Sequence, residues 1–530
     1  MQYDYVIIGS GFGGSVSALR LSEKGYKVLV IEKGRWYRAE DFPKTNWELK
    51  KWLWEPRLGC FGFFKMTFLN HVSIVSGVGV GGGSLTYACT LPVPKKEFFT
   101  SGSWQHLADW EQELAPFYET AYRMLGADFN PKLFDADHAV RQLAREMGKE
   151  EDFRPTKVSV FFGAPGKTVP DPFFEGKGPD RSGCIHCGAC MTGCRHNAKN
   201  TLDKNYLYLA QQLGTEILAE REVYDVLPLD GEDGSTGYRI RFKPSTQGFG
   251  KKRGEVTAKG VVFAGGVLGT VPLLLKLKQK SLPRLSNQVG CQVRTNNESL
   301  IMVTSLANDE KDFSKGLAIG SILHTDHNSH LEPTRYGEGS SFFKTMTIPM
   351  VTGGNVLVRL ARLFFKILSA PLRFFKVVFM KNHASKTTIL LFMQTLDSTI
   401  RIKRGRLTKM KTVKEEGPVP NAFIPEAWDL AKKYERIVDG VSFVNFADVL
   451  LDSPTTAHIL GGAVMGKDAG EGVIDKDNRV FGYQNMLICD GSMISANPGV
   501  NPALSITAIS ERAMSKIPEK NSSSSATFLA

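Results

Sequence analysis

The N-terminal pattern of apolar and polar positions predicts a strand, a helix and a second strand in close succession. An unbroken apolar run, Tyr5–Ile8, leads into the glycine-rich segment Gly9–Gly14, and a helical pattern continues through Leu21. A second apolar run, Lys27–Ile31, ends in Glu32. Short apolar runs bounded by turn residues are typical of strands that are buried on both faces of a parallel sheet. The chain is therefore predicted to open with a βαβ unit.

The glycine-rich turn has the G-x-G-x-x-G spacing of a dinucleotide-binding loop, and an acid follows 18 residues after the last glycine. Gly9 permits the tight turn, Gly11 lets the backbone approach a pyrophosphate, and Gly14 lets the helix pack closely on the strand. Glu32 can accept hydrogen bonds from a ribose hydroxyl. These features predict a bound dinucleotide and leave open whether it is FAD or NAD.

Length and composition narrow the class of protein. A chain of 530 residues exceeds one simple core and predicts two domains. Its hydrophobic content of 42% and charged content of 23% are those of a globular protein. The net charge of +12 favours an anionic partner; because no nucleic-acid-binding motif accompanies it, we expect lipid headgroups rather than nucleic acid. The first residues include no basic n-region, so we expect no signal peptide and a cytoplasmic protein.

Five further segments resemble the signatures of the glucose–methanol–choline (GMC) flavoproteins. Three are similar to segments that contact FAD in that family and two to its active-site motifs: Gly77–Leu85, Val261–Gly266, Ile488–Ser492, Ala457–Gly462 and Gly499–Pro502. Glycine is needed wherever a backbone touches a planar or anionic ligand, so each FAD-contacting segment also makes physical sense alone. The resemblance extends over most of residues 1–515, and Asn501 points within the family toward the bacterial cholesterol oxidases.

The resemblance implies FAD as the cofactor and an α/β fold, in which an FAD-binding, Rossmann-like domain with a parallel sheet carries an inserted α+β substrate domain with an antiparallel sheet. It divides the chain into a discontinuous FAD domain, a substrate domain and a disordered tail, with the bounds 1–95, 184–292 and 449–517, then 96–183 and 293–448, then 518–530. The residues that it places at the cofactor are Gly9, Gly11, Phe12, Gly13, Gly14, Glu32, Gly79, Gly82, Gly83, Ser84, Val223, Ala264, Gly265, Asp490, Gly491, Asn501 and Pro502.

By the same resemblance, His458 and Asn501 lie before the flavin and hold the substrate hydroxyl. Oxidation of a secondary alcohol moves a hydride to flavin N5 and a proton off the oxygen. An imidazole can accept that proton, and a fixed amide can hold the oxygen without becoming charged. We therefore expect oxidation of the 3β-hydroxyl of cholesterol or a related sterol to the 3-ketone, with oxygen as the acceptor.

Three alternatives to this function stay open at this point. The first is a GMC alcohol dehydrogenase that passes electrons to a partner through an iron–sulfur cluster. The second is a flavin-containing lyase of the same fold, and the third is a non-catalytic membrane-bound flavoprotein.

The resemblance also implies a glutamate in the substrate domain that moves the C4 proton of a sterol during double-bond isomerisation. The segment expected to carry it, Leu391–Leu396, contains no acid. Ile459 in addition replaces the proline that is usual after the catalytic histidine. We therefore expect the 3-ketone to form, and isomerisation to be weak or to use another group.

Four of the eight cysteines lie within eleven residues and have the spacing C-x2-C-x2-C-x3-C: Cys184, Cys187, Cys190 and Cys194. This spacing matches the ligand run of a ferredoxin-type iron–sulfur cluster, although Arg195 stands where proline is usual. Zinc is one alternative, and a packed or disulfide-linked group of thiols is another. The expected cytoplasmic location disfavours disulfides.

Two stretches outside these motifs suggest ligands or partners. His324, His327 and His330 invite a metal-site interpretation, but we expect them to lie in a loop beside Pro333. Residues 356–381 carry six cations and no acid among mostly apolar residues.

In this basic and apolar stretch, Pro371 predicts a break between two helices. The first helix would place cations on one face and large apolar residues on the opposite face: Arg359, Arg362 and Lys366 against Leu357, Phe364 and Leu368. Such a composition is typical of a helix lying on anionic lipid, which predicts peripheral contact with the inner membrane surface. The alternative is an internal lid or core helix with snorkelling cations.

Overall fold

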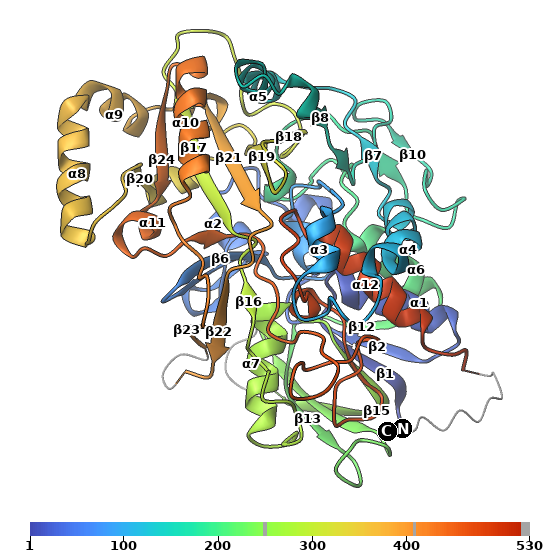
Figure 1. Ribbon diagram of the computed structural model, residues 1–530. Helices are drawn as coiled ribbons and strands as arrows, with labels where there is room; N and C mark the ends of the chain where they lie inside the picture. Colours follow the sequence, from blue (N-terminus) through green and yellow to red (C-terminus); the bar gives the residue numbers. More distant parts are fainter. Residues whose placement is uncertain (247–251, 406–409, 521–530) are drawn as a thin grey trace.

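The computed structural model describes residues 1–246, 252–405 and 410–520, and two large sheets organise it (Figure 1). The first sheet has the order β12-β2-β1-β15-β14-β13, with β26 also paired to β15. Strands β12, β2, β1, β15 and β26 run parallel, whereas β13, β14 and the first part of β15 form an antiparallel meander. The bounds are β1 Tyr3–Ile8, β2 Val28–Ile31, β12 Glu216–Leu218, β13 Arg221–Pro228, β14 Tyr238–Pro244, β15 Gly254–Phe263 and β26 Met486–Ile488.

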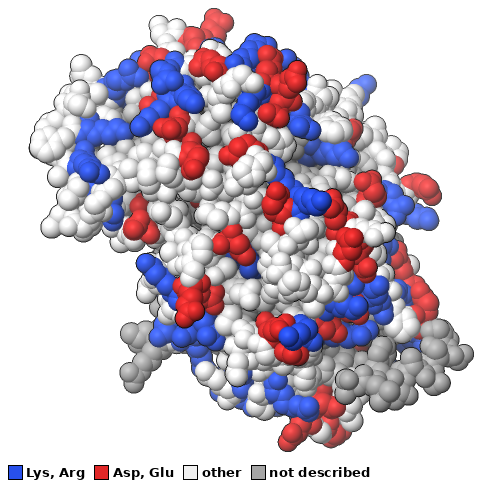
Figure 2. All heavy atoms as spheres, viewed as in Figure 1, with Lys and Arg blue, Asp and Glu red and all other residues white. Residues whose placement is uncertain are grey.

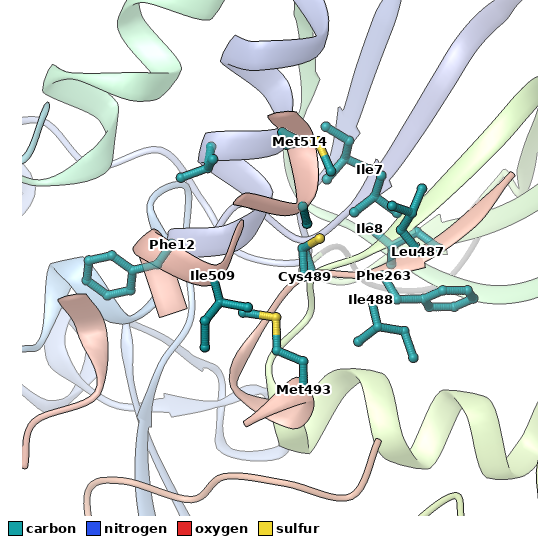
Figure 3. Close-up of a cluster of buried hydrophobic side chains, with 14 of the residues drawn as sticks. Ile7, Ile8, Phe12, Phe263, Leu487, Ile488, Cys489, Met493, Ile509 and Met514 are labelled. Carbon is teal, nitrogen blue, oxygen red and sulfur yellow. The ribbon is translucent and has the colours of Figure 1, made fainter. Parts of the chain in front are cut away.

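The apolar runs read from the sequence as strands are buried in this first sheet. Helix α1 (Phe12–Glu23) packs on β1 and β2, and α12 (Ala503–Ser515) packs against α1. Figure 3 shows part of the core that results, in which Ile7 and Ile8 lie beside Leu487, Cys489 and Met514 from the C-terminal part of the chain. The predicted βαβ unit is confirmed, and residues almost 500 positions apart close its core.

The second sheet is antiparallel and has the order β20-β24-β17-β21-β19-β18-β8. Helices α5 (Asp135–Glu146) and α10 (Pro425–Val438) pack on it and share its apolar core. Together the two sheets confirm the predicted fold class. The bounds are β8 Phe153–Pro155, β17 Glu298–Ser305, β18 Ser321–His324, β19 Ser329–Thr334, β20 Thr347–Pro349, β21 Thr387–Gln394 and β24 Gly440–Asn445.

Smaller elements connect the two sheets. Strand β6 pairs with both β5 and β25, and β22 pairs with both β16 and β23. Their bounds are β5 Phe64–Leu69, β6 Val72–Gly77, β16 Val293–Arg294, β22 Thr399–Lys403, β23 Lys411–Lys414 and β25 Thr455–Thr456. The remaining α-helices are α2 Leu49–Trp52, α3 Lys96–Thr100, α4 Trp110–Met124, α6 Tyr206–Gln212, α7 Val267–Lys278, α8 Val356–Ser369, α9 Pro371–Val378 and α11 Phe446–Leu450.

The strands of the two sheets fall on opposite sides of the division drawn from the sequence, but that division stays a prediction. Two helices depart from it, because α3 and α4 contribute to the core of the first sheet although residues 96–183 were assigned to the substrate domain. Part of the predicted disordered tail is held in place, since Lys520 Nζ lies 2.6 Å from Asp4 Oδ2. Residues 521–530 lie outside the described residues.

Helices α8 and α9 project from the second sheet at the edge of the molecule, on the left of Figure 1. The predicted break at Pro371 is confirmed, because α8 ends at Ser369 and α9 begins at Pro371. Within the described ranges, no helix combines the length and the apolar character that crossing a bilayer requires.

Candidate active site

A cavity of about 820 Å³ lies between the two sheets. One side is formed by residues at the carboxyl ends of β1, β2 and β15, which is where open parallel sheets bind their ligands. The other side is formed by β17, β19 and β21 of the second sheet and is largely apolar, with Leu300, Met302, Ile389 and Leu391 in the wall. The size and the mixed lining are those of a small-molecule site.

Most residues predicted at the cofactor or the catalytic centre line this cavity. Those in its wall are Gly9, Gly11, Phe12, Gly13, Glu32, Gly82, Gly83, Val223, Ala264, Gly265, His458, Asp490, Gly491, Asn501 and Pro502. Gly14, Gly79 and Ser84 lie outside the wall and serve local packing. Ser84 Oγ, for example, donates to Gly81 O at 2.7 Å and accepts from Leu202 N at 3.1 Å, which fixes the glycine-rich loop.

The glycines of the first turn differ in what surrounds them. A Cβ on Gly9 would lie 2.3 Å from Ala264 O, and one on Gly14 would lie 2.2 Å from Gly9 O, so both positions are closed by backbone. A Cβ on Gly11 would meet only Ala264 O, at 4.0 Å, and would otherwise point into open space beside the start of α1. This open approach to a helix N-terminus fits a pyrophosphate, as the spacing of the glycines predicted.

Two acids hold the backbone around the cofactor side of the cavity. Glu32, at the end of β2, accepts from Ser10 N at 3.0 Å and from Gly34 N at 2.8 Å. Asp490 accepts from Gly266 N at 2.9 Å and from Ser492 N at 2.8 Å, and burial raises its pKa. Asp490 thereby ties the turn after β15 to the segment after β26, two segments predicted separately as FAD contacts.

The histidine predicted to be catalytic, His458, is oriented by an acid that the sequence analysis did not name. His458 Nδ1 lies 2.7 Å from Glu298 Oε2, and Ala457 N donates to Glu298 Oε1 at 2.6 Å. Because a carboxylate accepts, Nδ1 carries the hydrogen and Nε2 is left as the proton acceptor. Glu298 is the first residue of β17 and its side chain is fully buried.

A second buried acid lies behind Asn501. The Asn501 amide is oriented so that its nitrogen lies 3.0 Å from Glu332 Oε1 and 3.1 Å from Oε2. Burial, and secondarily the charge of Glu298, raise the pKa of Glu332 to about 8, against the opposing effect of the Asn501 hydrogen bond. Glu332 shares its face of β19 with Thr334, which lines the cavity.

Glu332 places a carboxyl group beside the predicted site although the segment Leu391–Leu396 contains no acid, so it is a candidate for the other group that the sequence left open. The segment Leu391–Leu396 begins within β21, whose Leu391 pairs with Glu332 of the neighbouring strand β19. The segment predicted from the sequence to carry the glutamate therefore lies on the strand next to the one that carries Glu332. A usable signal did exist, because Glu298 and Glu332 are isolated acids within strands that are otherwise apolar or weakly polar.

The four clustered cysteines do not form a ligand set. All eight cysteines are free thiols, and within the described ranges no three His, Cys, Asp or Glu side chains are grouped as metal ligands would be. Cys184, Cys190 and Cys194 instead pack with buried Cys89 and neighbouring apolar side chains. The geometry thus favours the packed-thiol alternative, and the iron–sulfur interpretation stays a prediction without a ligand set to support it.

The expected loop around the histidines is also corrected. His324 is the last residue of β18, His330 is the second residue of β19, and Pro333 lies inside β19. Only the turn between the two strands, which includes His327, is irregular.

The fold and the cavity are those of a dinucleotide-binding protein, and comparison with known proteins narrows this class. The "GMC oxidoreductase" family models match residues 177–281 and 407–510, and an "NAD(P)-binding Rossmann-like domain" model matches residues 7–37. The chain is 44% identical to a cholesterol oxidase of Acinetobacter baumannii, over 98% of this chain and 95% of that protein. It is also 44% identical to a cholesterol oxidase of Mycobacterium tuberculosis, over 98% and 92%.

The chain therefore belongs to the GMC oxidoreductase family and is an FAD-dependent enzyme that acts on CH–OH groups. Among solved structures, pyridoxine 4-oxidase from Mesorbium loti has the same fold, with a TM-score of 0.59, 15% identity and coverage of 97% of this chain and 98% of that one.

We predict that Gly11→Ala weakens FAD binding without unfolding the protein. The backbone angles of Gly11, φ −70° and ψ −167°, suit alanine, and the added methyl group would enter the space left for the pyrophosphate. We expect at least a tenfold loss of affinity, about 1.4 kcal/mol, in a fluorescence titration of apoprotein with FAD. Gly13→Ala is the contrasting variant, because its Cβ would lie 1.9 Å from Cys489 O and should lower the melting temperature itself. Wild-type FAD affinity in Gly11→Ala would contradict the assignment.

Proposed function

We propose that this protein oxidises the 3β-hydroxyl of cholesterol or a related sterol to the 3-ketone, with molecular oxygen as the final acceptor. The observation that carries the proposal is the pair His458 and Asn501 in the wall of a cavity whose second-sheet side is apolar. A sterol is a large apolar ring system with one hydroxyl, so such a wall suits it. The 44% identity to two bacterial cholesterol oxidases supports the same substrate class.

The residues of the chain divide the work of the reaction. FAD, when bound by the glycine-rich turns, supplies the hydride acceptor. His458 takes the hydroxyl proton at Nε2, because Glu298 occupies Nδ1 and stabilises the imidazolium that forms. The amide of Asn501 helps to fix the alcohol oxygen, while the apolar wall excludes water from the reacting carbon.

The test is anaerobic mixing with cholesterol, followed by flavin absorbance in a stopped-flow instrument. We expect the flavin to bleach, and His458→Gln to slow bleaching by about 10²- to 10⁴-fold, the usual effect of removing a general base. His106→Gln is the control, since His106 is exposed and outside the cavity wall. A flavin that no sterol bleaches would refute the proposal, as would a His458→Gln variant with wild-type rates. Peroxide production in air distinguishes oxygen from a partner protein as the acceptor.

We further propose that Glu332 acts on the 5-en-3-one product and moves its C4 proton to C6, which conjugates the double bond with the ketone. Support comes from a carboxyl group placed directly behind Asn501, on the strand face that lines the cavity. A carboxylate with a raised pKa is a stronger base than an exposed one, as abstraction of a carbon-bound proton requires.

This role predicts the pH dependence of isomerisation. The pKa of Glu332 is raised to about 8, so the carboxyl is mostly protonated below that pH and the active carboxylate accumulates above it. We expect the isomerisation of a 5-en-3-one steroid to accelerate from pH 6 to pH 9, measured as the ultraviolet absorbance of the conjugated enone. Glu332→Gln should lose at least about 10²-fold in this step and keep flavin reduction by cholesterol. Unchanged isomerisation in Glu332→Gln would show that another group is the base.

We also propose that the helical hairpin α8–α9 docks the enzyme on a lipid surface from which the sterol is taken. The apolar face of the hairpin points outward: Leu357 is 71% exposed, Phe364 60% and Leu372 83%. The left edge of Figure 2, where the hairpin projects, is accordingly mostly uncharged. An exposed apolar face of this extent is typical of an interaction surface, and a cytoplasmic enzyme would meet it at the inner membrane surface.

The cations of the hairpin change the kind of lipid surface that we expect. Five of them donate to groups of the protein body rather than standing free on the outer face: Arg359 to Val449 O, Arg362 to Thr352 O, Lys366 to Met350 O, Arg373 to Asp439 Oδ1 and Lys376 to Leu306 O. From the sequence alone, these cations are instead expected to contact anionic headgroups. Since five of the six cations are engaged by groups of the protein, insertion of apolar side chains is the main driving force that remains, although Arg362, Arg373 and Lys376 stay exposed to solvent.

The hairpin is adjacent to the cavity. Phe68 lines the cavity wall, is half exposed, and contacts the ring of Phe446 at the start of α11. Helix α11 packs against α8, so one side of the cavity and the lipid-facing helix share a neighbour. A sterol leaving the lipid beside α8 would therefore travel a short way to the cavity.

We predict binding to neutral phosphatidylcholine vesicles, with little dependence on salt or on added anionic lipid. Changing Leu357, Phe364 and Leu372 together to serine should weaken vesicle binding at least tenfold in a sedimentation assay, because each exposed apolar group loses its transfer free energy. Leu213→Ser is the control, because Leu213 is an exposed leucine (53%) at the end of α6, away from the hairpin. Binding only to anionic vesicles, abolished by salt, would restore the headgroup interpretation.

A further inference from the structure

Two buried groups, Glu332 and His330, and the partly exposed His324 form a row that leads from beside the cavity toward the protein surface. His330 is completely buried, and neither of its ring nitrogens has a hydrogen-bond partner among the described residues. Its Nε2 lies 3.8 Å from Glu332 Oε1, and its ring centroid lies 6.1 Å from that of His324. His324 is partly exposed, and its Nδ1 also has no partner among the described residues. Buried nitrogens without partners are rare in folded proteins, so two neighbouring histidines that both have them, next to a buried acid, need a functional explanation.

The strand geometry builds this row. His330 and Glu332 are two residues apart on β19, which puts their side chains on the same face. His324 and His330 are register partners across the antiparallel pair β18 and β19, so their side chains face each other across the two strands. The turn between the strands is fixed by Lys95, whose Nζ donates to Asp326 O at 2.8 Å and to Ser329 O at 3.2 Å.

Burial, together with the surrounding charges, keeps the imidazoles of His330 and His324 neutral. Burial lowers the pKa of His330 well below its usual value, and the nearby His324, Lys95 and His458 lower it further. Burial lowers the pKa of His324 to about 4, with Lys95 and Arg154 acting in the same direction and Asp152 against them. A neutral imidazole has one donor and one acceptor nitrogen, so it can pass a proton on without holding a charge.

We propose that His330 and His324 form a proton path between Glu332 and the protein surface. The inference rests on the isomerisation proposed for Glu332. A base that is protonated at rest must lose its proton before it can act, and a sterol that fills the cavity shuts off water on that side. The two histidines supply an exit along this face of the sheet.

The path moves one proton, and no group is oxidised or reduced. The O–H bond of Glu332 breaks as an N–H bond forms at Nε2 of His330. The hydrogen on Nδ1 of His330 moves to His324 and from there to solvent, so the net change is one proton moved from Glu332 to water. A small side-chain rotation closes the 3.8 Å gap between Glu332 Oε1 and His330 Nε2, and one water molecule carries the proton between the rings of His330 and His324, whose centroids lie 6.1 Å apart.

The experiment follows exchange with solvent during turnover of a 5-en-3-one steroid in D2O by the FAD-loaded enzyme. A proton that Glu332 takes from C4 can return directly to C6, or can first exchange along the path with solvent deuterium. We expect deuterium at C6 of the wild-type product, measured by mass spectrometry, and at least fivefold less in His330→Phe. Phenylalanine is close in shape to histidine and leaves no unpaired nitrogen, so the variant should fold.

His324→Phe is the second variant and should lower deuterium incorporation in the same way, even if His330→Phe were poorly folded. His327→Phe is the matched control, because it changes an exposed histidine of the same turn and should leave incorporation at the wild-type level. Wild-type incorporation in both His330→Phe and His324→Phe would overturn the path, as would a wild-type product without deuterium.

Failure of the path and failure of the proposed isomerisation give different results. If Glu332→Gln still converts the 5-en-3-one at the wild-type rate, the role proposed for Glu332 is wrong and the two histidines have no proton to carry. If Glu332→Gln is inactive and His330→Phe exchanges like wild type, only the path is wrong. Flavin bleaching by cholesterol tests the oxidation separately and does not depend on either histidine.

Discussion

The buried carboxylate of Glu298 is the interaction on which the arrangement of the site depends. It accepts from Ala457 N and from His458 Nδ1, so a strand of the second sheet fixes both the backbone and the ring of the catalytic segment. The same segment continues to Gly461, whose N–H donates to Gly491 O beside the predicted FAD contacts. Glu298 thus fixes the position of the predicted proton acceptor, His458, relative to the predicted cofactor-binding loops. Leaving a carboxylate so deeply buried without these donors would cost several kcal/mol, so the contact is also a strong constraint on folding.

Local chemistry explains which parts of this structure could be predicted from the sequence. The glycine turn, its strands and the break at Pro371 follow from backbone rules that act over a few residues. The residues around the cofactor could be placed because the family motifs carry their own positions. Glu332 could not be placed, because its role depends on pairing between β19 and β21, whose residues lie about sixty positions apart. Strand pairing of this kind is set by the whole sheet and leaves little trace in either strand alone.

The hairpin α8–α9 shows a second limit of prediction from the sequence, which concerns the orientation of an amphipathic helix. Its pattern correctly separated a basic face from an apolar face, and helical periodicity alone fixes that separation. Periodicity does not say which face turns toward the protein. The carbonyl groups that receive the cations come from segments scattered between Leu306 and Val449, and they could be recognised only once the fold was known. The electrostatic interpretation of the helix changed for that reason, while its amphipathic character did not.

An apolar substrate and a proton-transfer reaction make opposite demands on one cavity. The sterol favours dry, apolar walls, whereas proton transfer needs ionisable groups that can exchange with water. The structure separates these demands by layer: apolar side chains such as Met302 and Leu391 form the wall, and the acids lie behind or beside it. The charge of Glu298 raises the pKa of Glu332, so ionising both acids in this low-dielectric layer is unfavourable. A proton must therefore leave Glu332 each time it becomes a base, and the row His330–His324 gives that proton a route within the second sheet that does not cross the substrate.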